Sequence, residues 1–154
     1  MARKVGMKVY LETKSILSSG NINSLLINLY KYGMLENVTV CTDDFEMAVS
    51  LSNRAPKMIR IGLMAEFLTE NMRTAFNSII ANGNPVMWWG YKSTSITNDM
   101  LYFISPNKIS YEVGDFQTVG QVSTYMSNTN AWACNGMEME GFVNPLIGQY
   151  IESL

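Results

Sequence analysis

Residues 7–42, MKVYLETKSILSSGNINSLLINLYKYGMLENVTVCT, alternate between two kinds of apolar pattern. The short run MKVYLET predicts a strand. Helical spacing follows in NINSLLINLYKYG, with Asn21 or Asn23 as a candidate cap and Gly33 where a C′ glycine is expected. NVTVCT then predicts a second strand, in which Cys41 is a buried residue. The stretch is therefore one strand–helix–strand unit.

The same alternation continues to about residue 92. DDFEMAVSLSN predicts a helix. Thr42 is a candidate hydroxyl cap for it, and Asp43 and Asp44 place acids at the positive end of the helix dipole. KMIRIGLM predicts a strand, AEFLTENMRTAFNSIIANG over 65–83 a helix, and PVMWWGYK a fourth strand. Strands that alternate with helices of this length indicate parallel βα units and an α/β fold.

The second half of the chain is less regular. MLYFISPNKISYEV predicts either a hairpin that turns at Pro106 and Asn107, or one more strand of the same sheet in KISYEV. DFQTVGQVSTYM is compatible with helix or strand, and the last ten residues, 145–154, predict a helix with Pro at its first position. We therefore expect a βα-repeat region over 1–114 and a C-terminal extension over 115–154 that packs on it.

Composition restricts the function more than it restricts the fold. The 154 residues are enough for one domain with a core, and 11 Lys and Arg against 13 Asp and Glu give a formal charge of −2. Nucleic-acid binders carry a basic stripe or a high pI, so we expect no nucleic-acid partner. Histidine is absent, which excludes a self-contained Ser-His-Asp or Cys-His site and a His metal ligand.

Further exclusions concern cysteine and targeting. Cys41 and Cys134 lie too far apart in sequence for a CxxC motif or a zinc spacing. The N-terminal segment has basic residues but no apolar h-region, and no apolar run approaches the roughly 18 residues of a membrane span. We expect a soluble chain without a signal peptide, cytoplasmic or virion-associated.

Charged residues make up only 16% of the chain, below the roughly 25% of an average globular protein. Biased base composition of the coding DNA is one explanation. A surface partly buried in an assembly is the other, because interfaces lose Lys and Glu and gain Met and aromatic residues.

Glu12 and Lys14 end the first predicted strand. Side chains two residues apart on a strand point to the same face, and ligands of α/β proteins bind at the C-terminal ends of parallel strands. A carboxylate and an ammonium there can serve one phosphate, because the carboxylate holds a divalent cation and the ammonium binds a phosphoryl oxygen. A plain salt bridge at a strand end is the alternative.

Several segments together resemble the glycerophosphodiester phosphodiesterase family, whose members are TIM barrels. They are MKVYLETK, then LLINLYKYGMLENVTVCTDDFEMAVSL, then MIRIGLM, then IIANGNPVMWWGYKS, spanning about residues 6–95. The family has, in this order, a strand ending in Glu-x-Lys, a helix ending in a KYGL-like segment, an SSFD-like strand end, a GLL strand and a tryptophan-bearing strand. The resemblance implies a partial or shortened TIM-type barrel.

The resemblance also assigns roles to individual residues. Glu12 matches the metal-binding glutamate and Lys14 the catalytic, phosphate-contacting lysine. Trp88 or Trp89 matches the tryptophan that lines the substrate site, although packing in the core is an equal alternative. An acid at the end of the next strand, Asp43 or Asp44, matches SSFD, for which a helix-cap role is the stronger interpretation. The implied cofactor is Ca²⁺ or Mg²⁺.

The departures from the family pattern are substantial. The family's two catalytic histidines and its first metal-binding Glu and Asp lie on earlier strands, in HRG, ExT and ExD-type motifs, and none of these precedes Met7. A strand that usually separates the GLL and tryptophan strands is replaced by one helix. The barrel would then be completed by the rest of a longer chain, by a partner protein, or by closure on itself or on a copy with loss of catalysis.

Two functions follow from these considerations. The first is part of a metal-dependent glycerophosphodiester phosphodiesterase-like hydrolase, which takes its catalytic histidines from outside this chain. Related domains attached to phage tail proteins are thought to act on glycerol-phosphate polymers of the cell wall, so a phage-tail or cell-wall association is implied. The second is a non-catalytic structural or assembly protein, for example a virion component that forms oligomers.

Overall fold

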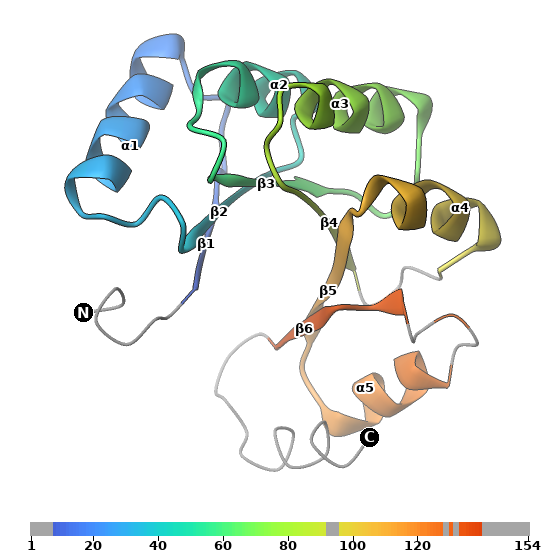
Figure 1. The fold of residues 1–154 in the computed structure, drawn as a ribbon. Helices are drawn as coiled ribbons and strands as arrows, with labels where there is room; N and C mark the ends of the chain where they lie inside the picture. The colour runs from blue at the N-terminus through green and yellow to red at the C-terminus, as the bar shows by residue number, and fades with distance from the viewer. Residues whose placement is uncertain (1–7, 92–95, 128–129, 131–132, 140–154) are drawn as a thin grey trace. The chain divides into compact units, whose positions relative to one another are not determined.

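The computed structural model describes residues 8–91, 96–127, 130 and 133–139. Helices and strands alternate along the whole of this part, as Figure 1 shows. Their bounds are β1 Val9–Glu12, α1 Ser19–Lys31, β2 Val38–Thr42, α2 Phe45–Arg54, β3 Arg60–Met64, α3 Glu70–Ala81, β4 Val86–Tyr91, α4 Asn98–Asn107, β5 Ser110–Phe116, α5 Val119–Met126 and β6 Gly136–Met139.

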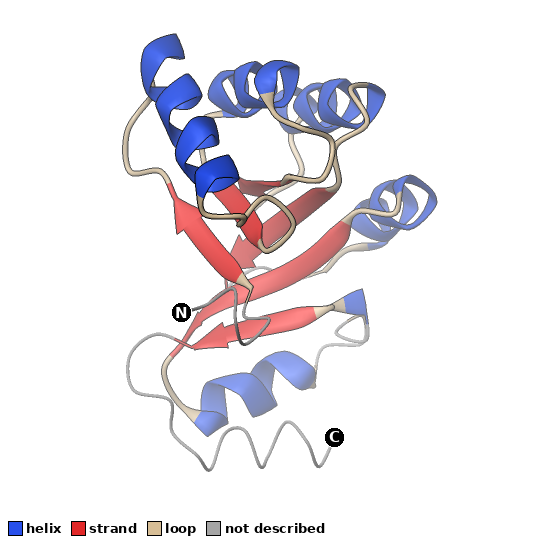
Figure 2. Ribbon diagram, turned by 60° about the vertical axis from the view of Figure 1, so that its left-hand side comes forward, coloured by secondary structure: helices blue, strands red, loops and turns tan. Residues whose placement is uncertain are grey.

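The strands form one sheet in the order β1-β2-β3-β4-β5-β6, which is also their order along the chain. The pairs β1–β2, β2–β3 and β5–β6 are parallel, and a helix separates consecutive strands in each case (Figure 2). A doubly wound sheet reverses its strand order at a switch point, whereas a (β/α) barrel does not. The structure therefore confirms an α/β fold of parallel βα units with the strand order of a partial TIM-type barrel.

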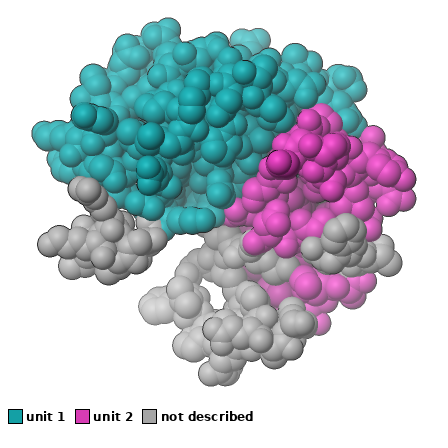
Figure 3. Space-filling model, in the orientation of Figure 1, with its two compact units in different colours: residues 1–64, 68–88 teal, residues 65–67, 89–154 magenta. Residues whose placement is uncertain are grey.

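The chain divides into two compact units, 1–64 with 68–88 and 65–67 with 89–154, which Figure 3 distinguishes by colour. The division at residue 114 that we expect from the sequence stays a prediction. The helix expected over 145–154 lies outside the described residues.

The first unit has an apolar core between its strands and helices. β2 is buried along its whole length, as expected for a parallel strand that is covered on both faces. Helices α2 and α3 pack side by side in this unit. The largest fully buried side chains of the unit are Trp88, Phe76, Ile22, Leu51, Ile59, Ile61, Leu63, Met72, Ile79 and Met87.

Each helix of the first unit begins at a side-chain cap. The Asn21, Met47 and Met72 amides donate to the side chains of Ser18, Asp44 and Thr69 respectively. Such a cap satisfies one of the amides that the first helical turn leaves without a partner. The prediction of Asn21 or Asn23 as the first cap was wrong, because Ser18 caps the helix three residues earlier than Asn21.

One predicted boundary changed for a similar reason. The helix expected over 65–83 begins only at Glu70, because Thr69 is its extended N-cap. Phe67, which falls within the expected span, lies before the helix and is 68% exposed. The other end agrees with the prediction: Asn82 is the C-cap and Gly83 has a φ of 84°, a left-handed conformation that favours glycine.

In the second unit, the hairpin predicted at Pro106 and Asn107 was wrong. Thr97 caps α4, which continues through Pro106 in its last turn and ends at Asn107. Lys108 is its C-cap, with a φ of 53°. The alternative, one more strand in KISYEV, is confirmed by β5. The ambiguous segment after it becomes α5, which Thr118 and Gln121 open with a capping box.

A buried polar network fixes the chain before β3 and β4 begin. The Ser52 hydroxyl donates to Asn84 Oδ1 at 3.0 Å, and the Asn84 amide donates to the carbonyls of Pro56 and Ile59 at 3.0 and 3.2 Å. Asn82 extends the network by donating to the Ser52 hydroxyl at 3.1 Å. The network joins α2 to the segments that lead into β3 and β4. Each of these polar groups has a hydrogen-bond partner, so its burial costs little free energy.

Candidate active site

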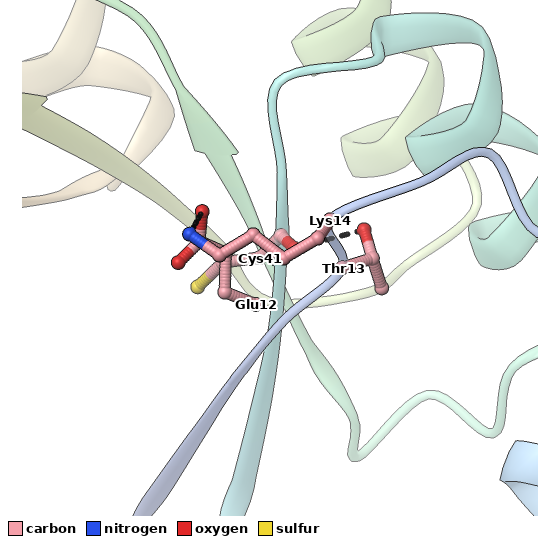
Figure 4. A network of polar contacts seen from close by, with 4 residues as sticks. All are labelled: Glu12, Thr13, Lys14 and Cys41. Carbon is pink, nitrogen blue, oxygen red and sulfur yellow. Dashed lines mark hydrogen bonds and ion pairs between the residues drawn. The ribbon is translucent and has the colours of Figure 1, made fainter.

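Glu12 is the last residue of β1, and Lys14 follows two residues later. The structure brings the two side chains into direct contact, with Lys14 Nζ 2.5 Å from Glu12 Oε1. Figure 4 shows the lysine side chain directed at the carboxylate. The Lys14 side chain is 79% exposed and therefore mostly in contact with water, whereas the Glu12 side chain, at 40%, is only partly so. The same-face placement predicted from their spacing is consistent with this contact.

Thr13, between the two charged residues, ties the end of β1 to β2. Its amide donates to the Cys41 carbonyl at 2.9 Å, and its hydroxyl donates to the same carbonyl at 3.2 Å (Figure 4). The Leu17 amide then contacts Met47 Sδ at 3.3 Å. Hydrogen bonds to β2 and the contact with Met47 thus hold the backbone that carries Glu12 and Lys14, while the two charged side chains pair with each other.

The next two strands place small groups beside Glu12. In the register of the sheet Glu12 is opposite Cys41, and Cys41 is opposite Gly62. Cys41 is a buried thiol, as predicted. A Cβ at Gly62 would lie 2.7 Å from Cys41 Sγ, so a glycine is required for the strands to pack in this way.

The two tryptophans of β4 have different surroundings. The Trp88 ring is fully buried in the first unit, with its centroid 6.3 Å from that of Phe76. The Trp89 ring, in the second unit, covers Gly114 so closely that a Cβ there would lie 2.6 Å from the indole. The role of either residue in lining a substrate site stays a prediction.

The strand-end acids of β2 differ in what they do. Asp44 Oδ1 accepts the Met47 amide at 2.7 Å, and Thr42 Oγ1 accepts the Asp44 amide at 3.0 Å. Asp44 is therefore the N-cap of α2, which agrees with the cap interpretation of the sequence, while Asp43 is exposed.

A divalent-cation site needs several oxygen ligands, and Ca²⁺ takes six to eight. Among the residues that the structure describes, no three His, Cys, Asp or Glu side chains converge on one point. Glu12 supplies one carboxylate, and its nearest recorded charge partner is Lys14. These residues alone do not fit a complete Ca²⁺ or Mg²⁺ site.

Two features were not anticipated from the sequence. The first is an open groove of about 650 Å³ between α2 and α3, lined by Phe45, Val49, Asn71 and Thr74 among others. It contains neither Glu12 nor Lys14. Its lining residues alternate with buried ones on two amphipathic helices, so no motif in the sequence marks them.

The second is a pair of buried tyrosines in the second unit, Tyr111 and Tyr125. Burial, followed by the electrostatic influence of Tyr111, raises the pKa of Tyr125 above its ordinary value. The Tyr125 ring also packs edge-to-face on Phe116 at 5.5 Å between centroids.

No protein-family model matches the chain, and no curated protein does. Among solved structures, the chain is similar to a protein from Galdieria sulphuraria assigned as a glycerophosphodiester phosphodiesterase, with a TM-score of 0.68 and 16% identity over 96% of this chain and 57% of that one. A protein from Silicibacter pomeroyi with a corresponding assignment gives a TM-score of 0.63 and 12% identity, over 86% and 46% of the two chains.

A third similar structure, of a protein from Agrobacterium tumefaciens with a corresponding assignment, gives a TM-score of 0.63 and 10% identity over 94% of this chain and 57% of that one. The expected resemblance to the phosphodiesterase fold is confirmed. At these identities the likeness is one of fold. The chain spans about half the length of the solved structures it matches.

Among the described residues, no helix is long and apolar enough to cross a membrane.

Proposed function

We propose that this chain is part of a glycerophosphodiester phosphodiesterase-like hydrolase, in which Lys14 contacts the phosphate of the substrate. The observation that carries the proposal is the Glu12–Lys14 pair at the C-terminal end of β1, in a sheet with the strand order of a barrel. The fold similarity to three proteins assigned as such phosphodiesterases supports it.

The chemistry assigned to this chain is electrostatic. A phosphodiester gains negative charge on its phosphoryl oxygens as it is attacked, and a fixed ammonium offsets that charge. Lys14 suits this task because its side chain is largely exposed and a phosphate can approach it. Glu12 orients the ammonium before substrate arrives. Proton transfers fall to histidines outside this chain, since the chain has none.

We propose Ca²⁺ or Mg²⁺ only as a cofactor of the completed barrel. When bound, such an ion would polarise the phosphodiester, and Glu12 would be one of its ligands. Further ligands would come from residues outside those described. The rest of a longer polypeptide, or a protein partner, would complete the barrel. The location that we propose for the completed protein is a phage tail or the cell wall.

A non-catalytic assembly role is the second candidate. It is favoured by large apolar side chains that the structure leaves exposed, among them Ile16, Ile27, Tyr30 and Tyr102, with exposed fractions between 66% and 79%. Exposed apolar groups of this size gather at protein–protein interfaces.

The coding sequence upstream of Met1 is the first test. A reading frame that continues upstream into a His-Arg pair and an E-x-D motif would support the hydrolase. A start codon with its own ribosome-binding site, and no such motifs in a neighbouring gene, would argue for the assembly role.

Activity is the second test. Hydrolysis of a glycerophosphodiester by the complete native protein should fall at least a hundredfold in Lys14→Met, on the order of the loss when one electrostatic contact to a transition state is removed. Lys57→Met removes an exposed lysine outside the site and should be neutral. Equal activity in wild type and Lys14→Met would remove Lys14 from the mechanism.

A further inference from the structure

The segment that joins β1 to the N-cap of α1, residues 13–17, carries Lys14. We call it the β1–α1 loop. Where the loop begins, it is tied to the sheet, because the Thr13 amide and hydroxyl both donate to the Cys41 carbonyl. The ion pair with Glu12 holds the loop only weakly, since the lysine side chain in it is 79% exposed. The order of the loop therefore depends on how its other end is held.

A buried sulfur holds that other end. The Leu17 amide donates to Met47 Sδ at 3.3 Å, and the Thr13 hydroxyl lies 3.9 Å from the same sulfur. Met47 is 4% exposed, so water has little access to this acceptor. Ser15 and Ile16, between the two ends, are exposed and make no hydrogen bond with any described residue. Met47 is therefore the group that closes the loop.

The Met47 sulfur has a defined position because α2 has a defined start. The Met47 amide donates to Asp44 Oδ1 at 2.7 Å, and the Asp44 amide donates to Thr42 Oγ1 at 3.0 Å. A methionine side chain is flexible by itself, but here its backbone is capped and its side chain is buried. An aliphatic side chain of the same size would fill the space without offering an acceptor.

We propose that Met47 is a positioning residue for Lys14, because its sulfur closes the loop on which the ammonium stands. A loop that is ordered in advance loses less conformational freedom when the ammonium meets a phosphate. The role of Lys14 in this inference rests on the proposed function. The closure of the loop by Met47 is a property of the chain itself.

Amide hydrogen exchange of the 154-residue chain, followed by NMR, tests the closure without any substitution. After correction for intrinsic rates, the Leu17 amide should exchange about tenfold more slowly than those of Ser15 and Ile16, as one retained hydrogen bond implies. Equal rates at the three amides would overturn the proposal. This comparison remains valid even if a variant does not fold.

Met47→Leu removes the acceptor while keeping an apolar side chain of similar volume. The Leu17 amide should exchange about tenfold faster in this variant than in wild type. Met72→Leu is the matched control, because Met72 is fully buried in α3 and its sulfur has no hydrogen bond with a described residue. An unchanged rate in Met47→Leu, or the same increase in Met72→Leu, would overturn the proposal.

Activity of the complete native protein tests whether the closed loop positions Lys14. Met47→Leu should lower kcat about tenfold with little change in KM, because the ammonium is aligned less often when charge develops on the phosphate. In a Lys14→Met background, Met47→Leu should have no further effect on kcat, a result that a loss of stability alone would not give. Equal losses in the two backgrounds would overturn the positioning role.

The proposed function and this inference can fail separately. Absence of hydrolysis by the complete native protein would overturn the proposed function, while the exchange rate of the Leu17 amide would still show whether Met47 closes the loop. An unchanged Leu17 rate in Met47→Leu would overturn the inference, whether or not Lys14→Met lowers activity.

Discussion

The first unit contains polar groups in two contrasting environments, one buried and one exposed. Before β3 and β4 begin, Ser52 and Asn84 are buried, neutral and fully engaged in hydrogen bonds. At the end of β1, Glu12 and Lys14 are charged, exposed and joined by one ion pair. Removing a partner from a buried network leaves desolvated groups behind, whereas an exposed ion pair is replaced by water. We interpret the first arrangement as a contribution to stability and the second as one that is free to respond to a ligand.

The largest expected effect is at the buried network. Asn84→Ala should lower the free energy of unfolding by about 2–4 kcal/mol, because the carbonyls of Pro56 and Ile59 and the Ser52 hydroxyl lose a partner while buried. Urea denaturation measures this. Asn28→Ala, at an exposed position on α1, should change stability by less than about 0.5 kcal/mol. Equal effects of the two substitutions would refute the distinction between buried and exposed amides.

Close packing beside Glu12 should give the next largest effect. Gly62→Ala should destabilise by about 1–3 kcal/mol, because its Cβ would lie 2.7 Å from Cys41 Sγ and 3.0 Å from Met87 Cε. In the Gly62→Ala/Cys41→Ala double variant the thiol is gone, so its loss of stability should be smaller than the sum of the single losses. A double variant whose loss is strictly additive would mean that the thiol is not the obstacle.

Gly120→Ala is the matched control for that substitution. In α5, the nearest atom to a Cβ at Gly120 is Thr118 Oγ1 at 3.9 Å, so there is room. Alanine also favours a helix over glycine, and the variant should gain up to about 1 kcal/mol in unfolding free energy. Destabilisation by Gly120→Ala would show that glycine substitutions are harmful here for a reason other than contact.

An intermediate effect is expected at the α2 cap. Asp44→Ala should cost about 1 kcal/mol, because the Met47 amide loses its acceptor, whereas Asp44→Asn retains one. Thermal unfolding of both variants checks this. The same loss in Asp44→Asn as in Asp44→Ala would indicate that the carboxylate charge matters more than the hydrogen bond.

The smallest effect on stability is expected at the site itself. Glu12→Gln should change the free energy of unfolding by less than about 1 kcal/mol, because an ion pair between exposed side chains contributes little to stability. Denaturation in low and in high salt measures the contribution, which salt should weaken in the wild type. A loss comparable to that of Asn84→Ala would mean that Glu12 is a structural residue, and the contrast between the two regions would fail.

The sequence by itself determined the local features. The alternation of strands and helices over 8–91, the left-handed glycine at Gly33 and the placement of Cys41 in a buried strand all follow from patterns within a few residues of one another. The ion pair of Glu12 and Lys14 was foreseen only as the alternative to a phosphate site, and Lys14 lies two residues beyond the end of β1. These predictions succeeded because backbone geometry fixes the relation between near neighbours.

Features that join distant segments were decided by the tertiary structure. The hydrogen bond between Ser52 and Asn84 spans 32 residues, and the packing of Cys41 on Gly62 depends on strand register, so neither has a local signature. The start of α3 at Glu70 and the helical state of MLYFISPN were likewise missed. The conformations open to such a short segment are nearly equal in free energy. Its caps, its burial and its tertiary neighbours therefore decide which one it adopts.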